Sequence, residues 1–494
     1  MNSRRALGQW LPPASGLSRR EVLGLGAAGL VLAGCSVRAD ADVEETAEPE
    51  PAPVHTIESM LAASPFLVAH RGSWDNWPEH TMTAYRESVN AGAVALEISV
   101  SATKDGTLIC NHDLDTGRTT GTKLVIKDTP YAELSKLKVD ARAWLGPGAV
   151  PEKIPLLKDV LDAFAATHVL FIDDKQGTNA KALLDLMDTY PDSRSHFIWK
   201  QSAEAAQIEA VSKRGYSSWG YFTVGQLELV PKYADRFTFL GVHHSASDAA
   251  VKKVVATGKP VICWEVHTRE LRDRLLGLGV TGLMCANLPY LATDEPIATS
   301  DSFGDGTRAA GDLPWMVNQG WDFQPELNPA ESTLLMSAAA NSSYRMGSLS
   351  PVRRELYSIA FEMRWPDSLP TDNSLHAGIA FGQDDDRPYR VLIPSDVGGY
   401  HLVVRVTGQM TLLLRSPGES GGLRLSTVDT EPVKIGQWMS FRIDVDPDSI
   451  RYSRLDGAGW AGVTSNRKYR GGYFSLARNY SEDCPVEFRN VKVL

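Results

Sequence analysis

The apolar positions of this chain follow two patterns, one before and one after about residue 300. From residue 57 to 297, short apolar runs alternate with amphipathic stretches, several of which end in glycine, and this predicts strands alternating with helices. Eight such units in this length predict an α/β fold, a TIM-like (β/α)8 barrel. The predicted strands are FLVAH, VALEISV, HVLFIDDK, HFIWKQ, SSWGYF, FTFLGVHH, PVICWEV and GLMCAN.

The regular alternation breaks after the second predicted strand, where a helix is missing. Residues 113–167 form an excursion instead, with a turn at GRTTGT and the amphipathic run IPLLKDVLDAFAA. We expect the turn to cover the mouth of the barrel. Just before the excursion, TLICNHD predicts a further buried strand that presents a polar group at its end.

The second part of the chain has the period of two that is typical of strands. A Gly/Ser/Thr/Asp-rich stretch at 298–310 predicts a linker, and residues 311–494 then form the second domain. Turn residues separate its alternating runs, so an antiparallel jelly-roll sandwich is expected. The runs are LYSIAFEMRW, LHAGIAFG, YRVLIP, YHLVVRV, MTLLLR, WMSFRIDVD, IRYSRL, YFSLAR and VEFRNVKV.

The N-terminal residues are typical of an export signal. Residues 1–35 contain a twin-arginine pattern at Arg19-Arg20, an apolar stretch, and LAGC ending at Cys35, which resembles a bacterial lipobox. A transmembrane anchor is the alternative, but the stretch has roughly 12 apolar residues against about 20 for a bilayer span. Residues 36–56 are acidic and proline-rich, which predicts a disordered tether. We therefore expect an exported, outward-facing, membrane-anchored lipoprotein.

Composition narrows the function classes. The net charge of −10 argues against sequence-independent nucleic-acid binding, while 43% apolar residues are normal for a soluble globular protein. Cysteine spacing indicates neither a metal cluster nor a disulfide framework. Buried thiols are expected at Cys110, Cys263, Cys285 and Cys484, with a Cys263–Cys285 bridge as the alternative.

Two short stretches concentrate the candidate chemistry. HRGSWDNWPEHT begins at His70, and LEISVSATKDGTLICNHD ends at Asp113. Polar groups at the C-terminal ends of barrel strands form the active sites of such folds. Two histidines can act as an acid–base pair, an arginine can hold a phosphate, and strand-borne carboxylates can hold a divalent metal.

These stretches resemble the glycerophosphodiester phosphodiesterase family. The motifs HRG, PEHT in place of PENT, a glutamate in GA-x-x-LE, TKDG, NHD, RTTG, IPLL, FIDDK and CWEV occur in the family's order. The resemblance covers about residues 57–297 and implies hydrolysis of a glycerophosphodiester, either a deacylated phospholipid or an envelope glycerophosphate polymer. It leaves open whether water or a neighbouring hydroxyl attacks.

The resemblance also implies roles for single residues. His70 and His112 would be the acid–base pair, and Arg71 and Lys175 would bind the phosphate. Trp264 would line the floor of the pocket, with His267 facing the substrate. The implied metal ligands are Glu97 and Asp173, supported by Glu79, and oxygen ligands favour Ca²⁺ or Mg²⁺.

One position departs from the family's pattern. Ser99 stands where the resemblance implies a second acid, in E-x-D, so we expect a weakened metal site. Three histidines at strand ends are candidates to compensate, although an ordinary loop histidine is the alternative for each: His243, His244 and His267. A fourth histidine, His80, is expected to bond backbone.

Other features have two readings. Trp74 and Trp77 either form an apolar lip for a lipid or pack under their loop. Asp384, Asp385 and Asp386 are expected to form a solvated acidic loop, with calcium binding as the alternative. The sandwich loosely resembles concanavalin-type and jelly-roll carbohydrate-binding modules, so cell-wall glycan is an expected partner, yet tryptophans of such domains are often core residues.

Two alternatives to the hydrolase stay open on sequence grounds. One is a phospholipid lyase that resembles sphingomyelinase D, which needs an apolar lip facing the membrane. The other is a weakly active or inactive glycan-binding envelope lipoprotein, suggested by the broken acidic triad. The paired histidines weigh against the second alternative, because a binding module has no need of an acid and a base at strand ends.

Overall fold

The computed structural model describes residues 53–295, 298–308, 326–336, 355–387, 396–480 and 482–494, and the backbone of 313–317 and 345–348. The predictions for the export signal with Cys35, for most of the tether and for YRVLIP lie outside the described residues. Within the described part of the chain, no helix combines the length and the apolar character needed to cross a membrane.

The first domain is a closed eight-stranded parallel barrel, as predicted. Its strands follow the order β1-β11-β10-β9-β8-β7-β6-β2, and pairing of β1 with β2 closes the ring. Every predicted strand is present: β1 (Phe66–Ala69), β2 (Ala95–Ala102), β6 (Val169–Asp174), β7 (Phe197–Ser202), β8 (Ser217–Phe222), β9 (Phe239–His243), β10 (Val261–Val266) and β11 (Gly282–Cys285).

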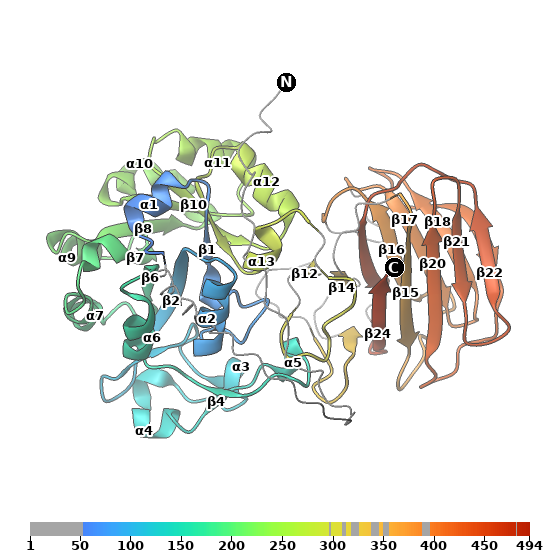
Figure 1. Cartoon of the computed structure of the whole chain (residues 1–494), viewed down its shortest axis with the longest axis horizontal. Coiled ribbons are helices and arrows are strands. Elements are labelled where there is room, and N and C mark those ends of the chain that lie inside the picture. Colours follow the sequence, from blue (N-terminus) through green and yellow to red (C-terminus); the bar gives the residue numbers. More distant parts are fainter. Residues whose placement is uncertain are drawn as a thin grey trace, which may run out of the picture. The chain divides into compact units, whose positions relative to one another are not determined.

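Helices surround these strands (Figure 1). Hydroxyl side chains begin four of them, because Thr56, Thr81, Ser247 and Thr268 each accept a hydrogen bond from a first-turn amide. The helices of the barrel are α1 (Ile57–Ala62), α2 (Met82–Asn90), α7 (Ala180–Met187), α8 (Ser193–His196), α9 (Ile208–Lys213), α10 (Val230–Tyr233), α11 (Asp248–Val255), α12 (Arg269–Gly277) and α13 (Leu288–Leu291), with 3-10 turns η1 (His70–Gly72), η3 (Val224–Leu229) and η4 (Ala234–Arg236).

The excursion confirms one expectation and corrects another. The run TLICNHD contains β3 (Leu108–Cys110), which pairs antiparallel with β2 and so is not a strand of the parallel ring. The helix that seemed to be missing is α6 (Leu157–Phe164), which packs its apolar face on the barrel at the end of the excursion. Between them lie α3 (Gly117–Thr120), η2 (Ile126–Asp128), α4 (Tyr131–Leu134), β4 (Lys138–Val139), α5 (Arg142–Leu145) and β5 (Glu152–Lys153).

The interior of the barrel has an apolar layer beneath a polar one. Every strand contributes to a buried apolar cluster, β1 and β6 with two residues each and the others with one, and Ile57 and Met60 of α1 join it. Because side chains alternate along a strand, the next inward position is two residues further on. The last member of the cluster on each strand is Val68, Ala95, Phe171, Ile198, Trp219, Phe239, Ile262 or Met284. The positions above them are His70, Glu97, Asp173, Lys200, Tyr221, Gly241, Trp264 and Ala286.

The second domain consists of two antiparallel sheets, which agrees with the predicted sandwich. Alternating burial along β15 and β20 directs one face of each strand into a shared apolar core. One sheet has the order β12 (Leu313–Val317), β14 (Arg345–Ser348), β23 (Tyr473–Arg478), β16 (His376–Gln383), β17 (Gly399–Arg405), β18 (Met410–Arg415) and β19 (Leu423–Val428). The other has β13 (Leu334–Met336), β24 (Val486–Val493), β15 (Tyr357–Arg364), β20 (Met439–Val445), β21 (Ile450–Arg454) and β22 (Trp460–Thr464).

Single residues settle several smaller predictions. Cys110, Cys263, Cys285 and Cys484 are buried free thiols, so the alternative Cys263–Cys285 bridge is wrong. Asp386 is buried, and its carboxylate accepts hydrogen bonds from the amides of Arg269 and Glu270 at the start of α12. The expectation of a wholly solvated acidic loop is therefore wrong for Asp386.

Candidate active site

The loop after β1 has a backbone shape that brings its polar groups together. Arg71 has φ 51° and Ser73 has φ 59°, both in the left-handed region. Gly72 lies between them at φ 76°, and a Cβ there would be 2.7 Å from the Cβ of Ala84, so only glycine fits. The Ser73 hydroxyl donates to Ala286 O and accepts from Leu288 N, which ties the loop to the end of β11.

A lysine that the sequence reasoning overlooked occupies the centre of the polar layer. Lys200 Nζ lies 2.7 Å from Glu97 Oε1 and 3.1 Å from Asp173 Oδ2. Burial would lower the pKa of Lys200, but the two carboxylates raise it above its usual value. Burial would raise the pKa of Glu97, but Lys200 and the neighbouring histidines hold it well below its usual range. Lys200 and Glu97 therefore stay charged.

Further donors complete the surroundings of the two carboxylates. Glu97 Oε2 accepts a hydrogen bond from the Arg71 amide at 3.0 Å, and Glu97 Oε1 accepts one from the Ser99 hydroxyl at 3.2 Å. Lys175 Nζ donates to Asp173 Oδ2 at 3.4 Å and lies 3.3 Å from His112 Nε2. The predicted partners Glu97, Ser99, Asp173 and Lys175 therefore meet on the inner face of the barrel, as strand alternation predicts.

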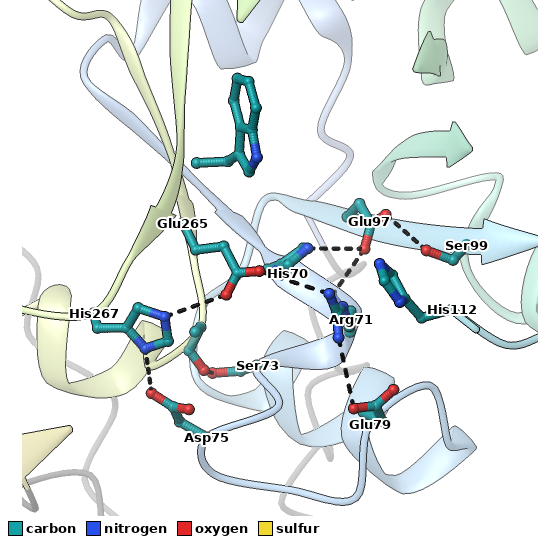
Figure 2. A network of polar contacts seen from close by, with 12 residues as sticks. His70, Arg71, Ser73, Asp75, Glu79, Glu97, Ser99, His112, Glu265 and His267 are labelled. Carbon is teal, nitrogen blue, oxygen red and sulfur yellow. Dashed lines mark hydrogen bonds and ion pairs between the residues drawn. The ribbon is translucent and has the colours of Figure 1, made fainter. Parts of the chain in front are cut away.

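A chain of acids and histidines lies on the opposite side of His70 (Figure 2). Glu265 Oε1 is 3.5 Å from His70 Nδ1 and 3.6 Å from Arg71 Nη2, and Glu265 Oε2 is 3.2 Å from His267 Nε2. His267 Nδ1 in turn is 2.8 Å from Asp75 Oδ2. Burial would lower the pKa of His267, but Asp75 and Glu265 raise it to about 9. His267 is therefore a cation at neutral pH.

His70 itself lies between two carboxylates in a nearly dry position. Its side chain is 4% exposed, and its Nε2 is 3.9 Å from Glu97 Oε2. Burial holds the pKa of His70 well below its usual value, despite the opposing effect of Glu265. His70 is therefore neutral at pH 7 and free to take up a proton.

The second histidine of the predicted pair is more open to solvent. The side chain of His112 is 27% exposed, and its Nδ1 is 2.8 Å from Asp113 Oδ1. The pKa of His112 lies below its usual value, because burial and the nearby Arg71 lower it more than the hydrogen bond with Asp113 raises it. A carboxylate on Nδ1 fixes the orientation of the ring and stabilises the imidazolium form.

An arginine from the excursion joins this histidine to the loop after β1. Arg118 donates from two nitrogens to the two oxygens of Glu79, at 2.7 Å each, and its Nε donates to Asp113 Oδ2 at 2.7 Å. Burial would raise the pKa of Glu79, but Arg118 and Arg71 lower it to about 2. Both oxygens of Glu79 thus have cationic partners, and the metal-supporting role stays a prediction.

The remaining candidates are aromatic residues and histidines. Trp264 is half-buried and packs edge-on against Trp219, Tyr221 and His243. Trp74 is 1% exposed and lies under Arg71, whose guanidinium is 4.6 Å from the ring, so Trp74 packs under its loop.

The two histidines that follow the main motifs have side-chain partners. His80 bonds the Tyr85 hydroxyl at 2.7 Å, not backbone as expected. His243 Nδ1 lies 2.7 Å from Ser245 Oγ, and its ring centroid is 4.2 Å from that of His244. These contacts do not place His80 or His243 against a carboxylate of the polar layer.

Three residues of this site were missed from the sequence. Lys200 had a usable signal, because it lies two positions after Ile198 in an apolar strand and so has the inward parity of Glu97. Glu265 had no such signal in the sequence. The pairing of β10 shifts register between Cys263 and Val266, so alternation along the strand does not predict where this side chain points. Arg118 lies in an irregular excursion, where no periodicity predicts its direction.

Comparisons with known proteins identify the family of this chain. Residues 70–287 match the Glycerophosphoryl diester phosphodiesterase family. A glycerophosphodiester phosphodiesterase of Bacillus altitudinis is 41% identical over 96 residues, which are 19% of this chain and 38% of that protein. Probable glycerophosphodiester phosphodiesterase 1 of Mycobacterium tuberculosis is 35% identical over 276 residues, 51% of this chain and 97% of that protein.

Solved structures include similar chains as well. A phosphodiesterase of Oleispira antarctica, in complex with the product sn-glycerol-3-phosphate, is 20% identical to this chain. The match covers 46% of this chain and 94% of that chain, with a TM-score of 0.40.

Proposed function

Because the chain belongs to the glycerophosphoryl diester phosphodiesterase family, a family of phosphoric diester hydrolases, we propose that its barrel cleaves a glycerophosphodiester into glycerol phosphate and an alcohol. The observation that carries the proposal is the pair His70 and His112, which lie on either side of a cluster of buried cations and carboxylates. Such a pair suits a diester, since attack needs a base and departure needs an acid.

The environments of the two histidines support different roles for them. His70 is neutral and buried, so it accepts the proton of the attacking oxygen, from water or from a glycerol hydroxyl. His112 is partly exposed and bonded to Asp113, so it gives a proton to the departing alkoxide. Glu265 stabilises the charge that His70 acquires, at 3.5 Å from its Nδ1.

Two cations hold the scissile phosphate in this proposal. Arg71 is 5% exposed, and its Nε has no hydrogen-bond partner among the described residues. A buried guanidinium nitrogen without a partner is suited to an anionic oxygen of a substrate. Lys175 Nζ, 3.3 Å from His112 Nε2, supplies a second positive charge beside the acid.

The divalent metal that the family resemblance implies does not fit the donor set of this site. The described part of the chain contains no group of three His, Cys, Asp or Glu side chains arranged to hold a metal ion. Ser99 contributes a neutral hydroxyl, and the Lys200 ammonium already contacts both Glu97 and Asp173. No step of the proposed reaction therefore depends on Ca²⁺ or Mg²⁺.

The phospholipid lyase alternative rested on Trp74 and Trp77 as an apolar lip, and it loses the first of these. It needs an apolar lip, but Trp74 is 1% exposed beneath Arg71 and presents no surface to a lipid. Soluble diesters such as glycerophosphocholine are therefore the substrates to try first, with lysophospholipids as a second arm of the assay.

The experiment measures glycerol 3-phosphate release from glycerophosphocholine by the wild type and by His70→Ala and His112→Ala. Each substitution is expected to lower kcat by about 10²–10⁴-fold. His168→Ala is the matched control, because His168 is also buried but precedes β6 at the other end of the barrel. Full activity in a folded H70A/H112A double variant would refute the proposal.

The location of the protein and the ligand of its sandwich are part of the same proposal. The lipobox motif supports lipidation of Cys35 and an outward-facing membrane anchor, and the jelly-roll pattern supports binding to cell-wall glycan. Cys35→Ala is expected to move the protein from the membrane fraction to the soluble fraction. Sedimentation with purified cell wall tests the glycan, and its loss on removing the second domain is the expected result.

A further inference from the structure

The polar layer of the barrel contains a lysine where a metal ion would have to bind. Lys200 projects from β7 at the inward position next to Asp173 of β6, and its ammonium touches the two acids that the resemblance assigned to metal. Its side chain is 8% exposed, while those of Glu97 and Asp173 are 0% and 5% exposed. The ion pair is thus built into the barrel and is not a surface contact.

Three of the four carboxylate oxygens of Glu97 and Asp173 accept from protein donors. Glu97 Oε1 takes the ammonium and the Ser99 hydroxyl, and Glu97 Oε2 takes the Arg71 amide. Asp173 Oδ2 is shared by Lys200 and Lys175. Calcium needs six to eight oxygen ligands at about 2.3–2.6 Å. An ion at that distance from Glu97 Oε1 and Asp173 Oδ2 would lie against the Lys200 ammonium, and the two positive charges would repel.

Ser99 and Lys200 both differ from the pattern that the family resemblance implies, and the two differences cancel in charge. Replacing a carboxylate by Ser99 removes one negative charge, and replacing a divalent ion by Lys200 removes one positive charge. The cluster therefore keeps its net charge, with one positive charge fewer and one carboxylate fewer. A serine and a lysine at these two inward positions therefore compensate each other, whereas the serine alone would leave a defective metal site.

We propose that the Lys200 ammonium replaces the divalent cation in this site, so that diester cleavage proceeds without a bound metal. The inference rests on the proposed function for the reaction itself. An ammonium has three N–H donors, and Glu97 and Asp173 account for two of them. The third donates to a phosphate oxygen or a glycerol hydroxyl of the substrate, and it stabilises negative charge as the P–O bond breaks.

The first test is binding of the metal alone. Calcium chloride and magnesium chloride are titrated calorimetrically into the full chain and into the variants Lys200→Ala and S99D/K200A. The wild type is expected to give no saturable heat. The double variant has three carboxylates and lacks the Lys200 ammonium, and it is expected to bind Ca²⁺ with Kd of about 10⁻⁴–10⁻³ M. Saturable binding of either ion to the wild type would overturn the inference.

The second test is turnover of glycerophosphocholine with excess chelator. The wild type is expected to keep its full rate, and Lys200→Met to lose about 10²–10³-fold in kcat, the size of one lost oxyanion donor. Lys200→Arg is expected to recover part of that loss, because it restores the charge. Added Ca²⁺ is expected to raise the rate of S99D/K200A but not of the wild type, and a merely structural role of Lys200 would not produce that gain.

Lys259→Ala is the matched control. Lys259 is a half-buried lysine just before β10, and its Nζ bonds the backbone oxygen of Phe237. A wild type that loses activity to chelator and regains it with Ca²⁺ would overturn the inference and leave the proposed function intact. A wild type inactive on every diester, with or without metal, would overturn the proposed function, and the calorimetry would still decide whether Lys200 excludes the ion.

Discussion

Arg118 is the residue whose loss should disturb the site most without touching its two histidines. It joins the excursion to the loop after β1 through Glu79, a side chain that is 2% exposed. Substitution by Met keeps an unbranched, largely apolar side chain but removes the guanidinium and its bidentate contact. Glu79 then keeps only Arg71, whose Nη1 is 3.8 Å away.

The size of the effect follows from the pKa of the buried carboxyl. Its arginine partners bring the pKa of Glu79 from 4.5 to about 2, and each pKa unit corresponds to about 1.36 kcal/mol. The native state therefore gains about 3 kcal/mol from the charged form of Glu79. Breaking a buried ion pair by removing one partner costs about 3–5 kcal/mol in general, which agrees.

Differential scanning calorimetry at pH 7 measures this loss as a fall in the Tm of the barrel, of about 5–10 °C in Arg118→Met. Arg142→Met is the control in the same excursion, because Arg142 pairs with Asp140 while 48% exposed. An exposed pair contributes about 0–1 kcal/mol, so little change is expected there.

The pH dependence gives a second check on the same reasoning. A carboxyl with a lowered pKa stabilises the native state fully above pH 4.5, and the effect is lost as the pH falls towards 2. The difference in Tm between wild type and Arg118→Met should therefore shrink between pH 5 and pH 3. A variant that unfolds within 1 °C of the wild type at pH 7 would refute the assignment of Glu79 and Arg118 as a stabilising pair.

Two further predictions concern the neighbourhood of β10 and α12. His267 has a pKa of about 9 in the native state against 6.5 in the unfolded state. Its contribution to the free energy of unfolding is therefore fully present below pH 6.5 and falls by up to about 3 kcal/mol as the pH rises through 9. His267→Asn should abolish that loss in urea unfolding measured from pH 6 to 9.5. Asp386→Ala removes the side chain that accepts from the first amides of α12, and it should lower the free energy of unfolding by about 0.5–2 kcal/mol in thermal unfolding. Asp384→Ala, at an exposed position, is the control and should cost almost nothing. Equal effects of the two substitutions would show that the contact of Asp386 with α12 does not stabilise the protein.

The barrel was predictable because each of its strands has a clear signal in the sequence. Each of the eight is a short, nearly continuous apolar run, since strands covered by helices on one side and filled on the other are buried on both faces. The structure of the excursion was not predictable in the same way. The antiparallel pairing of β3 with β2 depends on a turn, and the period of the apolar residues does not reveal that turn. The α6 helix was read as part of the excursion, although its apolar period was visible.

The residues of the active site were predictable only where a family motif or the alternation of side chains along a strand indicated them. Glu97, Ser99, Asp173 and Lys175 share the inner face because alternate residues on a strand do, and the structure confirms their contacts. Lys200 obeys the same rule but belongs to no motif. The partner of a side chain on another strand depends on the stagger of the barrel, which a single sequence does not reveal. Asp386 reaches α12 from more than a hundred residues away, and no local pattern indicates that contact.

The most direct test of the account follows the phosphorus atom of glycerophosphocholine by ³¹P NMR, with wild-type protein and excess chelator. The account predicts that the diester resonance disappears and the monoester resonance of glycerol 3-phosphate replaces it, either directly or after a transient cyclic phosphate. The same sample with His112→Ala should stay unchanged over the same time. A diester resonance that persists with the wild type, with chelator and also with added Ca²⁺ or Mg²⁺, would contradict the claim that this barrel is a phosphodiesterase.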